Sequence, residues 1–203
     1  DWRAAGLEGF GKEGDYVARQ IHRWTKQYKA SETQHIPEME QLIEWLPNNI
    51  PPGDKTTIVH GDYRLDNMVL HPTEPRVIAV LDWELCTLGD PLADFSYHLM
   101  NWVMPPGDSS RGSIMAIDDL KAWGIPTMDE YVDLYCKHTG RDGLPELDYY
   151  FAYNGFRLAG ILQGIIGRVR DGTANSANAE SNAARVVPLA KFAAEYARRA
   201  GMP

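Results

Sequence analysis

Residues 56–84 read TTIVHGDYRLDNMVLHPTEPRVIAVLDWE, and this stretch decides the expected fold. Short apolar runs at 56–59, 68–70 and 77–81 alternate with polar segments, which predicts three β-strands. The cluster HPTEP at 71–75 is typical of a turn between the second and third strands. The continuous apolar run 77–81 is the pattern of a strand that is buried on both faces.

Polar side chains follow these strands at their ends. Asp62 and Asn67 lie in the loop after the first strand, and Asp82 directly follows the third. Phosphoryl transfer needs a carboxylate that accepts the proton of the attacking hydroxyl, and oxygen ligands for Mg²⁺ on the nucleotide phosphates. Asp62 suits the first role, and Asn67 with Asp82 suits the second. The pattern therefore favours half of a phosphotransfer site.

The loop HGDYRLDN resembles the protein kinase catalytic loop, H-R-D-x-[KR]-x-x-N, with Gly61 in place of the arginine. LDWE stands where kinases have D-F-G. The combination is similar to the aminoglycoside phosphotransferase and choline kinase group. The wider stretch VHGDYRLDNMVLHPTEPRVIAVLDWELCTLGDPLADFSYH resembles the branch that includes domains fused to acyl-CoA dehydrogenases in some animals. The flanks GFGKEGDYVARQIHRWTKQY and FRLAGILQGIIGR fit the same branch, so the resemblance covers nearly the whole chain.

This resemblance implies an α+β, mostly helical, protein kinase-like fold, of which the chain is the C-terminal catalytic lobe with a small β element that carries the site. It implies ATP and Mg²⁺ as cofactors. It also implies that Asp62 and Arg64 are catalytic, with Arg64 near the transferred phosphate, and that Asn67 and Asp82 bind the metal and the nucleotide. For Arg64 an ion pair with Asp66 stays open as an alternative.

Two further residues, His60 and Asp94, are expected to support the catalytic loop. His60 is interpreted as a structural residue that packs beneath the loop, and not as a base. In kinase-like folds an aspartate on the helix after the metal-binding segment binds the backbone of the catalytic loop. Asp94 is the candidate for that contact, with Asp90 as its rival.

A complete kinase-like protein also needs an N-terminal lobe with a glycine-rich strand pair, a strand lysine and a helix glutamate. The glycines between residues 6 and 14 lack flanking strands, so no such lobe is visible. We expect residues 1–203 to be a C-terminal lobe that is inactive by itself, and whose missing partner is the N-terminal lobe of the same protein. An apolar face left exposed would then favour self-association, as a homodimer.

Helical periodicity accounts for most of the remaining chain. One face of the first helix carries Arg19, Arg23 and Lys26, either as a solvated side or as a basic wall for an anionic substrate tail. Arg157, on the longest helix, is interpreted as a structural ion pair, with substrate recognition as the alternative. Helices are expected at 15–29, from 37, at 92–103, from a Thr127–Glu130 capping box to Gly140, at 145–170 and near the C-terminus.

Composition narrows the choice of partners. The net charge of −8 and the pI near 5.2 argue against nucleic acid or an anionic membrane surface as the main partner. No apolar stretch reaches membrane-spanning length, and Cys86 and Cys136 have no metal spacing. We therefore expect a cytoplasmic protein with reduced thiols.

The expected function is that of an ATP- and Mg²⁺-dependent small-molecule O-phosphotransferase, a kinase with an alcohol group as acceptor. The sequence does not identify the acceptor, which is a hydroxylated acyl thioester or an aminoglycoside-like compound. Two alternatives stay open. One is a non-catalytic binding protein on a kinase fold, and the other is a metal-dependent hydrolase that uses His60, Asp62 and Asp82 as ligands.

Overall fold

The computed structural model describes residues 1–52, 56–104, 120–173 and 179–203. Helices make up most of it, and the four strands are short. The elements are α1 (Tyr16–Ser31), α2 (Pro37–Asn48), β1 (Thr57–Val59), β2 (Met68–Leu70), β3 (Val77–Val80), β4 (Thr87–Gly89), α3 (Pro91–Val103), α4 (Met128–Thr139), α5 (Leu147–Arg170) and α6 (Ala179–Arg199), with 3₁₀ turns at Leu65–Asn67, Trp83–Leu85 and Lys121–Trp123.

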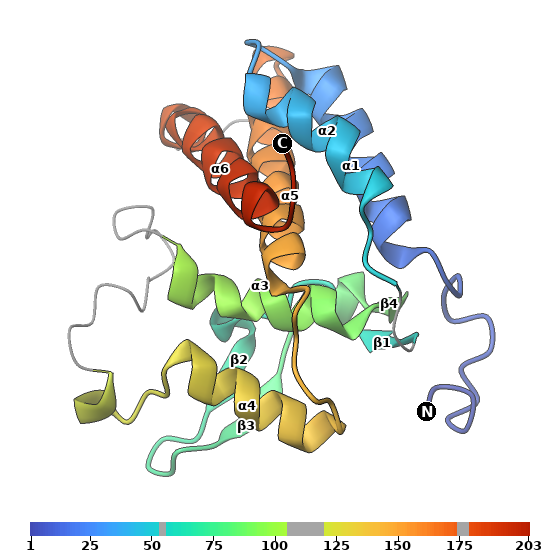
Figure 1. Ribbon diagram of the computed structural model, residues 1–203, viewed down its shortest axis with the longest axis vertical. Coiled ribbons are helices and arrows are strands. Elements are labelled where there is room, and N and C mark those ends of the chain that lie inside the picture. The colour runs from blue at the N-terminus through green and yellow to red at the C-terminus, as the bar shows by residue number, and fades with distance from the viewer. Residues whose placement is uncertain (53–55, 105–119, 174–178) are drawn as a thin grey trace.

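Helix α5 lies at the centre of the fold, as its broad apolar face predicts. It packs against α6 on one side and α1 on the other, and α3 crosses near its N-terminal end (Figure 1). Tyr150, Tyr153 and Phe156 of this helix are fully buried in the main core. Close contact with α1 requires small residues: a Cβ added to Gly167 would lie 2.5 Å from the Cβ of Ser31. The core thus holds α1, α3 and α6 around α5.

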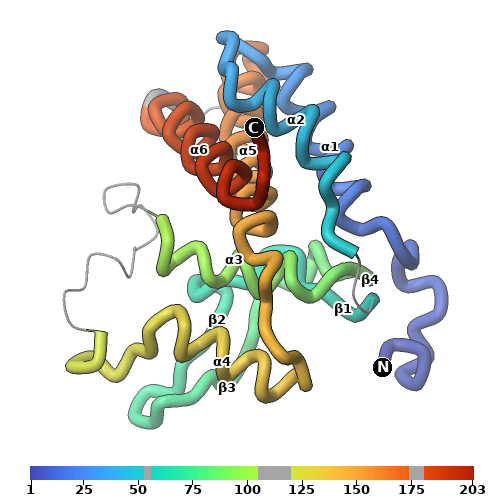
Figure 2. The backbone as a smooth tube through the Cα atoms, viewed as in Figure 1, coloured from blue at the N-terminus to red at the C-terminus, as the bar shows by residue number. Residues whose placement is uncertain are grey.

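The strands form two separate antiparallel pairs. In one, β1 pairs with β4 and Ile58 lies opposite Leu88. In the other, β2 and β3 form a hairpin in which Val69 lies opposite Ala79. The tube in Figure 2 shows this hairpin at the end of the molecule away from α1, α2 and α6. The catalytic loop expected from the sequence connects the two pairs.

The prediction that the strand after the turn is buried on both faces is wrong. Val77 and Ile78 of β3 are 45% and 48% exposed, and Leu81 just after it is 51% exposed. The reason is that β3 has a single partner strand, and no described helix covers its open face. This hairpin supplies an exposed apolar surface of the kind expected, and self-association through it stays a prediction.

Capping residues in the sequence predicted most helix ends correctly. The Thr127–Glu130 capping box is present in both directions, and α4 ends at Gly140 in the left-handed conformation. Asp15 precedes α1 as expected, but its side chain makes no capping hydrogen bond. Helix α2 begins at Pro37 as expected and continues through Pro47 to Asn48. No helix within the described ranges is long and apolar enough to cross a membrane.

A buried histidine joins α3 to its neighbours. The His98 ring lies among the rings of Tyr63, Trp102 and Tyr131, and its Nδ1 has no hydrogen-bond partner. Burial lowers the pKa of His98 to about 4. The neutral ring is therefore the form that the folded protein tolerates.

We predict that His98 makes the fold sensitive to mild acid. Because its folded-state pKa lies below the unfolded one, its contribution is complete above about pH 6.5 and is lost as pH falls toward 4, by roughly 3 kcal/mol. Urea unfolding of the wild type and of His98→Gln at several pH values measures this. The variant should lose less stability than the wild type between neutral pH and pH 4, and parallel curves would contradict the prediction.

Candidate active site

The catalytic loop begins with a glycine that no other residue can replace without strain. Gly61 has φ +84°, and a Cβ there would lie 2.8 Å from the carbonyl oxygen of Leu85. A side chain would therefore meet both a disfavoured backbone conformation and a backbone atom. Asp62 follows directly, so this turn sets the direction in which its carboxylate leaves the strand.

His60 connects the two strand ends of the site. Its Nδ1 accepts a hydrogen bond from the backbone N–H of Asp62 at 3.2 Å. The ring proton therefore lies on Nε2, which donates to the carbonyl of Leu81 at 2.8 Å. Both ring nitrogens are thus used to join Asp62 to the residue before Asp82, in line with the structural role interpreted from the sequence.

Of the two rival aspartates, Asp94 makes the contact with the loop. Its carboxylate accepts hydrogen bonds from the backbone N–H groups of His60, at 2.5 Å, and Gly61, at 3.0 Å. Asp90 instead caps α3 through the N–H of Leu92, at 2.9 Å, and accepts from the Tyr150 hydroxyl. Burial raises the pKa of Asp94, and the two backbone donors oppose that shift.

Asn67 lies directly against Asp62. Its Nδ2 donates to the Asp62 backbone carbonyl, at 2.9 Å, and to Oδ2 of the same residue, at 3.1 Å. This contact orients the carboxylate, and it directs the amide oxygen of Asn67 away from Asp62. The Asn67 carbonyl also accepts the N–H of Leu81 at 2.8 Å, which ties the loop to the segment that carries Asp82.

Asp82 is exposed and has φ 66°, in the left-handed region that residues other than glycine adopt uncommonly. It precedes the 3₁₀ turn Trp83–Leu85, and its side chain makes no capping hydrogen bond. Strained backbone of this kind occurs at functional sites, where the surrounding contacts hold it. The structure therefore brings Asp62 and Asn67 into contact, and it places Asp82 next to them through Leu81.

Arg64 forms an ion pair with Asp66, the alternative that the sequence left open. Arg64 is only 18% exposed, whereas the Asp66 side chain is 53% exposed. The guanidinium also lines the same cavity as Asp62. The contact expected with a transferred phosphate stays a prediction.

Arg157 belongs to the site, and the interpretation of it as an ion pair is wrong. From α5 it donates to the backbone carbonyl of Gly61 at 2.5 Å, and its guanidinium lies 4.9 Å from the centre of the Tyr97 ring. It is only 7% exposed. The signal was present in the sequence, because Arg157 falls on the apolar face of the helix between Asn154 and Ile161.

Two cavities lie on either side of the loop. One, of about 340 Å³, is lined by Gly61, Asp62 and Arg64 together with side chains of α1, α5 and α6. The other, of about 740 Å³, lies between β1, α3 and α4 and is lined mostly by apolar and aromatic side chains; His60 borders it, and Asp62 does not. Only the smaller of these two cavities reaches the carboxylate expected to act as the base.

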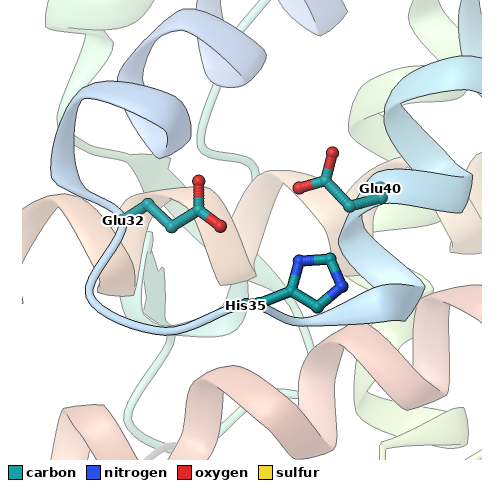
Figure 3. A group of neighbouring side chains, drawn as sticks. All are labelled: Glu32, His35 and Glu40. Carbon is teal, nitrogen blue, oxygen red and sulfur yellow. The ribbon is translucent and has the colours of Figure 1, made fainter.

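A group of possible metal ligands lies elsewhere, at the connection between α1 and α2. Figure 3 shows the side chains of Glu32, His35 and Glu40 gathered there. Their ligand atoms lie within 4.8 Å of one another. The ammonium group of Lys29 already pairs with Glu40, and lies 3.6 Å from Glu32. This group is therefore an ion-pair cluster that stabilises the turn between two helices.

A matched pair of glycines tests the geometry of the loop. We predict that Gly61→Ala destabilises the protein on the order of 2–4 kcal/mol, because it adds a backbone clash to an unfavourable φ. Gly140 has φ +69° with open space around it, so Gly140→Ala should cost only about 1 kcal/mol. Urea unfolding of both variants measures the difference, and equal losses would show that the contact with Leu85 is not limiting.

Comparison with known proteins places this site in context. Residues 1–131 match the model of the "Phosphotransferase enzyme family". Acyl-CoA dehydrogenase family member 10 of Mus musculus is 44% identical over 202 residues, which is 99% of this chain and 19% of that protein. Acyl-CoA dehydrogenase family member 11 of Homo sapiens is 40% identical over 95% of this chain and 25% of its own length. The chain thus spans about a fifth to a quarter of these relatives.

A solved structure supports the same assignment. The crystal structure of "a putative aminoglycoside phosphotransferase" from Ralstonia eutropha JMP134 superposes with a TM-score of 0.89 and 54% sequence identity. The match covers 98% of this chain and 60% of that one. The kinase-like, mostly helical fold expected from the sequence is therefore confirmed, and the interpretation of residues 1–203 as a C-terminal lobe stays a prediction.

Proposed function

Because the chain belongs to the phosphotransferase enzyme family, we propose that it carries the catalytic residues of a small-molecule O-phosphotransferase that transfers the γ-phosphoryl group of ATP to a substrate hydroxyl. Family and fold support kinase-like chemistry in general, and the nucleotide, the metal and the acceptor are part of the proposal. The observation that carries it is the contact between Asn67 and Asp62, which orients a carboxylate beside a cavity of about 340 Å³.

In the proposed reaction Asp62 is the base. The O–H bond of the acceptor breaks and its proton passes to the Asp62 carboxylate. The acceptor oxygen forms a bond to the γ-phosphorus, while the bond from that phosphorus to the β–γ bridging oxygen breaks and ADP leaves with the electron pair. Such a transfer depends mainly on positioning and on neutralising charge. The hydrogen bonds that hold Asp62 provide the positioning.

The residues present also fit a divalent cation. Asn67 uses its amide nitrogen on Asp62 and so has its amide oxygen for a cation, and Asp82 offers an exposed carboxylate on a strained backbone. These are the hard oxygen ligands that Mg²⁺ prefers. Bound there, Mg²⁺ would neutralise phosphate charge. Arg64, at the edge of the same cavity, would add a second cation near the transferred group.

The geometry gives no support to the hydrolase alternative. A metal ligand needs a free ring nitrogen, and both nitrogens of His60 are already hydrogen-bonded within the protein. A non-catalytic binding protein would not need an oriented base, and Asp62 is present and oriented.

The acceptor is a separate part of the proposal. Several relatives are named acyl-CoA dehydrogenases, and this chain corresponds to only a fraction of each. That arrangement supports a hydroxylated acyl thioester as acceptor. The name of the solved relative mentions an aminoglycoside instead. The arginines that line the cavity beside Asp62 favour an acceptor that is not polycationic.

We predict that Asp62→Asn, in the full-length protein, lowers ATP-dependent phosphotransfer by about 10²–10⁴-fold, because a positioned base is lost. Nucleotide affinity and unfolding temperature should stay close to wild type, since Asn keeps the shape of Asp62. Asp171→Asn, an exposed aspartate just after α5 and outside the lining of this cavity, is the matched control and should keep most activity. Transfer of labelled phosphate from ATP measures the effect, and near wild-type turnover in Asp62→Asn would refute the assignment of the base.

A further inference from the structure

The cavity beside Asp62 is lined by four arginines that come from separate parts of the chain. Arg23 belongs to α1, Arg64 to the catalytic loop, Arg157 to α5 and Arg185 to α6. The chain as a whole has a net charge of −8, so this gathering of positive charge runs against its composition. Among the residues that the structure describes, Asp62 is the only acidic one in the lining. A cationic wall therefore faces the carboxylate expected to act as the base.

Arg157 is buried, unlike the exposed Arg23. It is 7% exposed, its Nη2 is bound to the Gly61 carbonyl, and its Nε has no hydrogen-bond partner. A guanidinium stays protonated in proteins, and a buried charge is costly unless an anion or hydrogen bonds compensate for it. No described carboxylate forms an ion pair with Arg157. Asp62 and Asp94 lie near enough for their charges to interact with that of Arg157, and a bound anion in the cavity would add to this compensation.

Arg23 and Arg185 extend the wall on the two flanking helices. Of the basic residues on the outer face of α1, only Arg23 lines the cavity. Arg19 instead donates to the backbone carbonyls of Lys12 and Gly14, and Lys26 is exposed outside the lining. The guanidinium of Arg23 lies 5.1 Å from the centre of the Trp24 ring, which restricts its position.

Most of the other lining residues are apolar, and Tyr16, Gln20 and Tyr97 add polar atoms. A volume of about 340 Å³ is in the range of small-molecule pockets. A ligand that fits would have an apolar body and an anionic group. The apolar side chains come from the facing surfaces of α1, α5 and α6: Trp24, Leu158, Ile161, Leu162 and Leu189.

The cavity borders Asp62 but not the residues proposed to bind the metal. Its lining includes Gly61 and Asp62 but neither Asn67 nor Asp82, the two residues proposed to hold the metal and the nucleotide phosphates. The arginines of α1, α5 and α6 are therefore placed to meet the acceptor and not the triphosphate.

We propose that this cavity selects a hydroxylated acceptor that carries an anionic group, a carboxylate or a phosphate, which Arg23, Arg157 and Arg185 bind while the hydroxyl meets Asp62. The proposal rests on the proposed function of the same site. It excludes polycationic amino sugars as the preferred acceptors, because like charges would meet in a partly buried cavity. Arginine suits both oxyanions, since its planar fork binds carboxylate and phosphate alike.

Equilibrium binding to the full-length protein tests the proposal without requiring turnover. Calorimetry would compare hydroxyalkanoates of graded length with the hydroxyalkyl phosphates, neutral diols and amino alcohols of the same lengths. The anionic compounds should bind at least about 10-fold more tightly than the neutral and cationic ones. The stronger of the two anionic series then identifies the group as carboxylate or phosphate.

Arginine variants test whether the preference for anionic compounds comes from this cavity. Arg23→Gln and Arg185→Gln should each reduce the affinity for the anionic series by roughly 10-fold and leave that for the diols unchanged. Lys26→Gln, three residues from Arg23 on the same helix, should change neither. Equal affinity across the end groups, no measurable binding of any, or an anionic preference that survives both arginine variants would each overturn the proposal.

The same compounds separate this proposal from the proposed function. If the anionic series binds through Arg23 and Arg185 but no compound of any charge is phosphorylated by ATP, the proposed function fails and the anionic pocket stands. If ATP-dependent transfer that requires Asp62 proceeds without preference for anionic acceptors, the function stands and the pocket assignment fails.

Discussion

The carboxylate of Asp94 accepts the backbone N–H groups of His60 and Gly61, and the geometry of the catalytic loop depends on this contact. Those two N–H groups lie where β1 ends, so no sheet partner satisfies them. Leaving them unpaired in a buried place would cost roughly 1–3 kcal/mol each. Because Asp94 lies in the first turn of α3, which packs on α5, the central helix of the core positions the loop.

From this anchor, side-chain hydrogen bonds extend to the other residues of the site. His60 connects Asp62 with Leu81, and Asn67 holds the Asp62 carboxylate. Short strands explain why these contacts are needed. Each sheet has two strands of three or four residues, which is too small to fix the strand ends by backbone pairing alone. Arg157 completes the arrangement by binding the Gly61 carbonyl from α5.

Much of this could be predicted from the sequence because the signals were local. The order of Asp62, Asn67 and Asp82 between apolar runs indicated the loop, and the Thr127 capping box fixed a helix start. Tertiary features could not be predicted in this way. An apolar run does not show what covers it, so β3 was wrongly expected to be buried. Asp90 and Asp94 lie one helical turn apart. The sequence alone does not show which of the two carboxylates reaches the catalytic loop, because that depends on how α3 packs.

The most direct test of the account compares those two aspartates. In the full-length protein, Asp94→Asn should lower kcat for ATP-dependent transfer by about 10–100-fold, with little change in the KM for ATP, and should speed hydrogen exchange at the His60 and Gly61 amides, because an amide nitrogen cannot accept a hydrogen bond. Asp90→Asn, which removes an equal charge one turn earlier, should lower stability and leave kcat near wild type. Equal effects of the two variants on kcat, or an unchanged kcat in Asp94→Asn, would contradict the claim that Asp94 positions the catalytic loop.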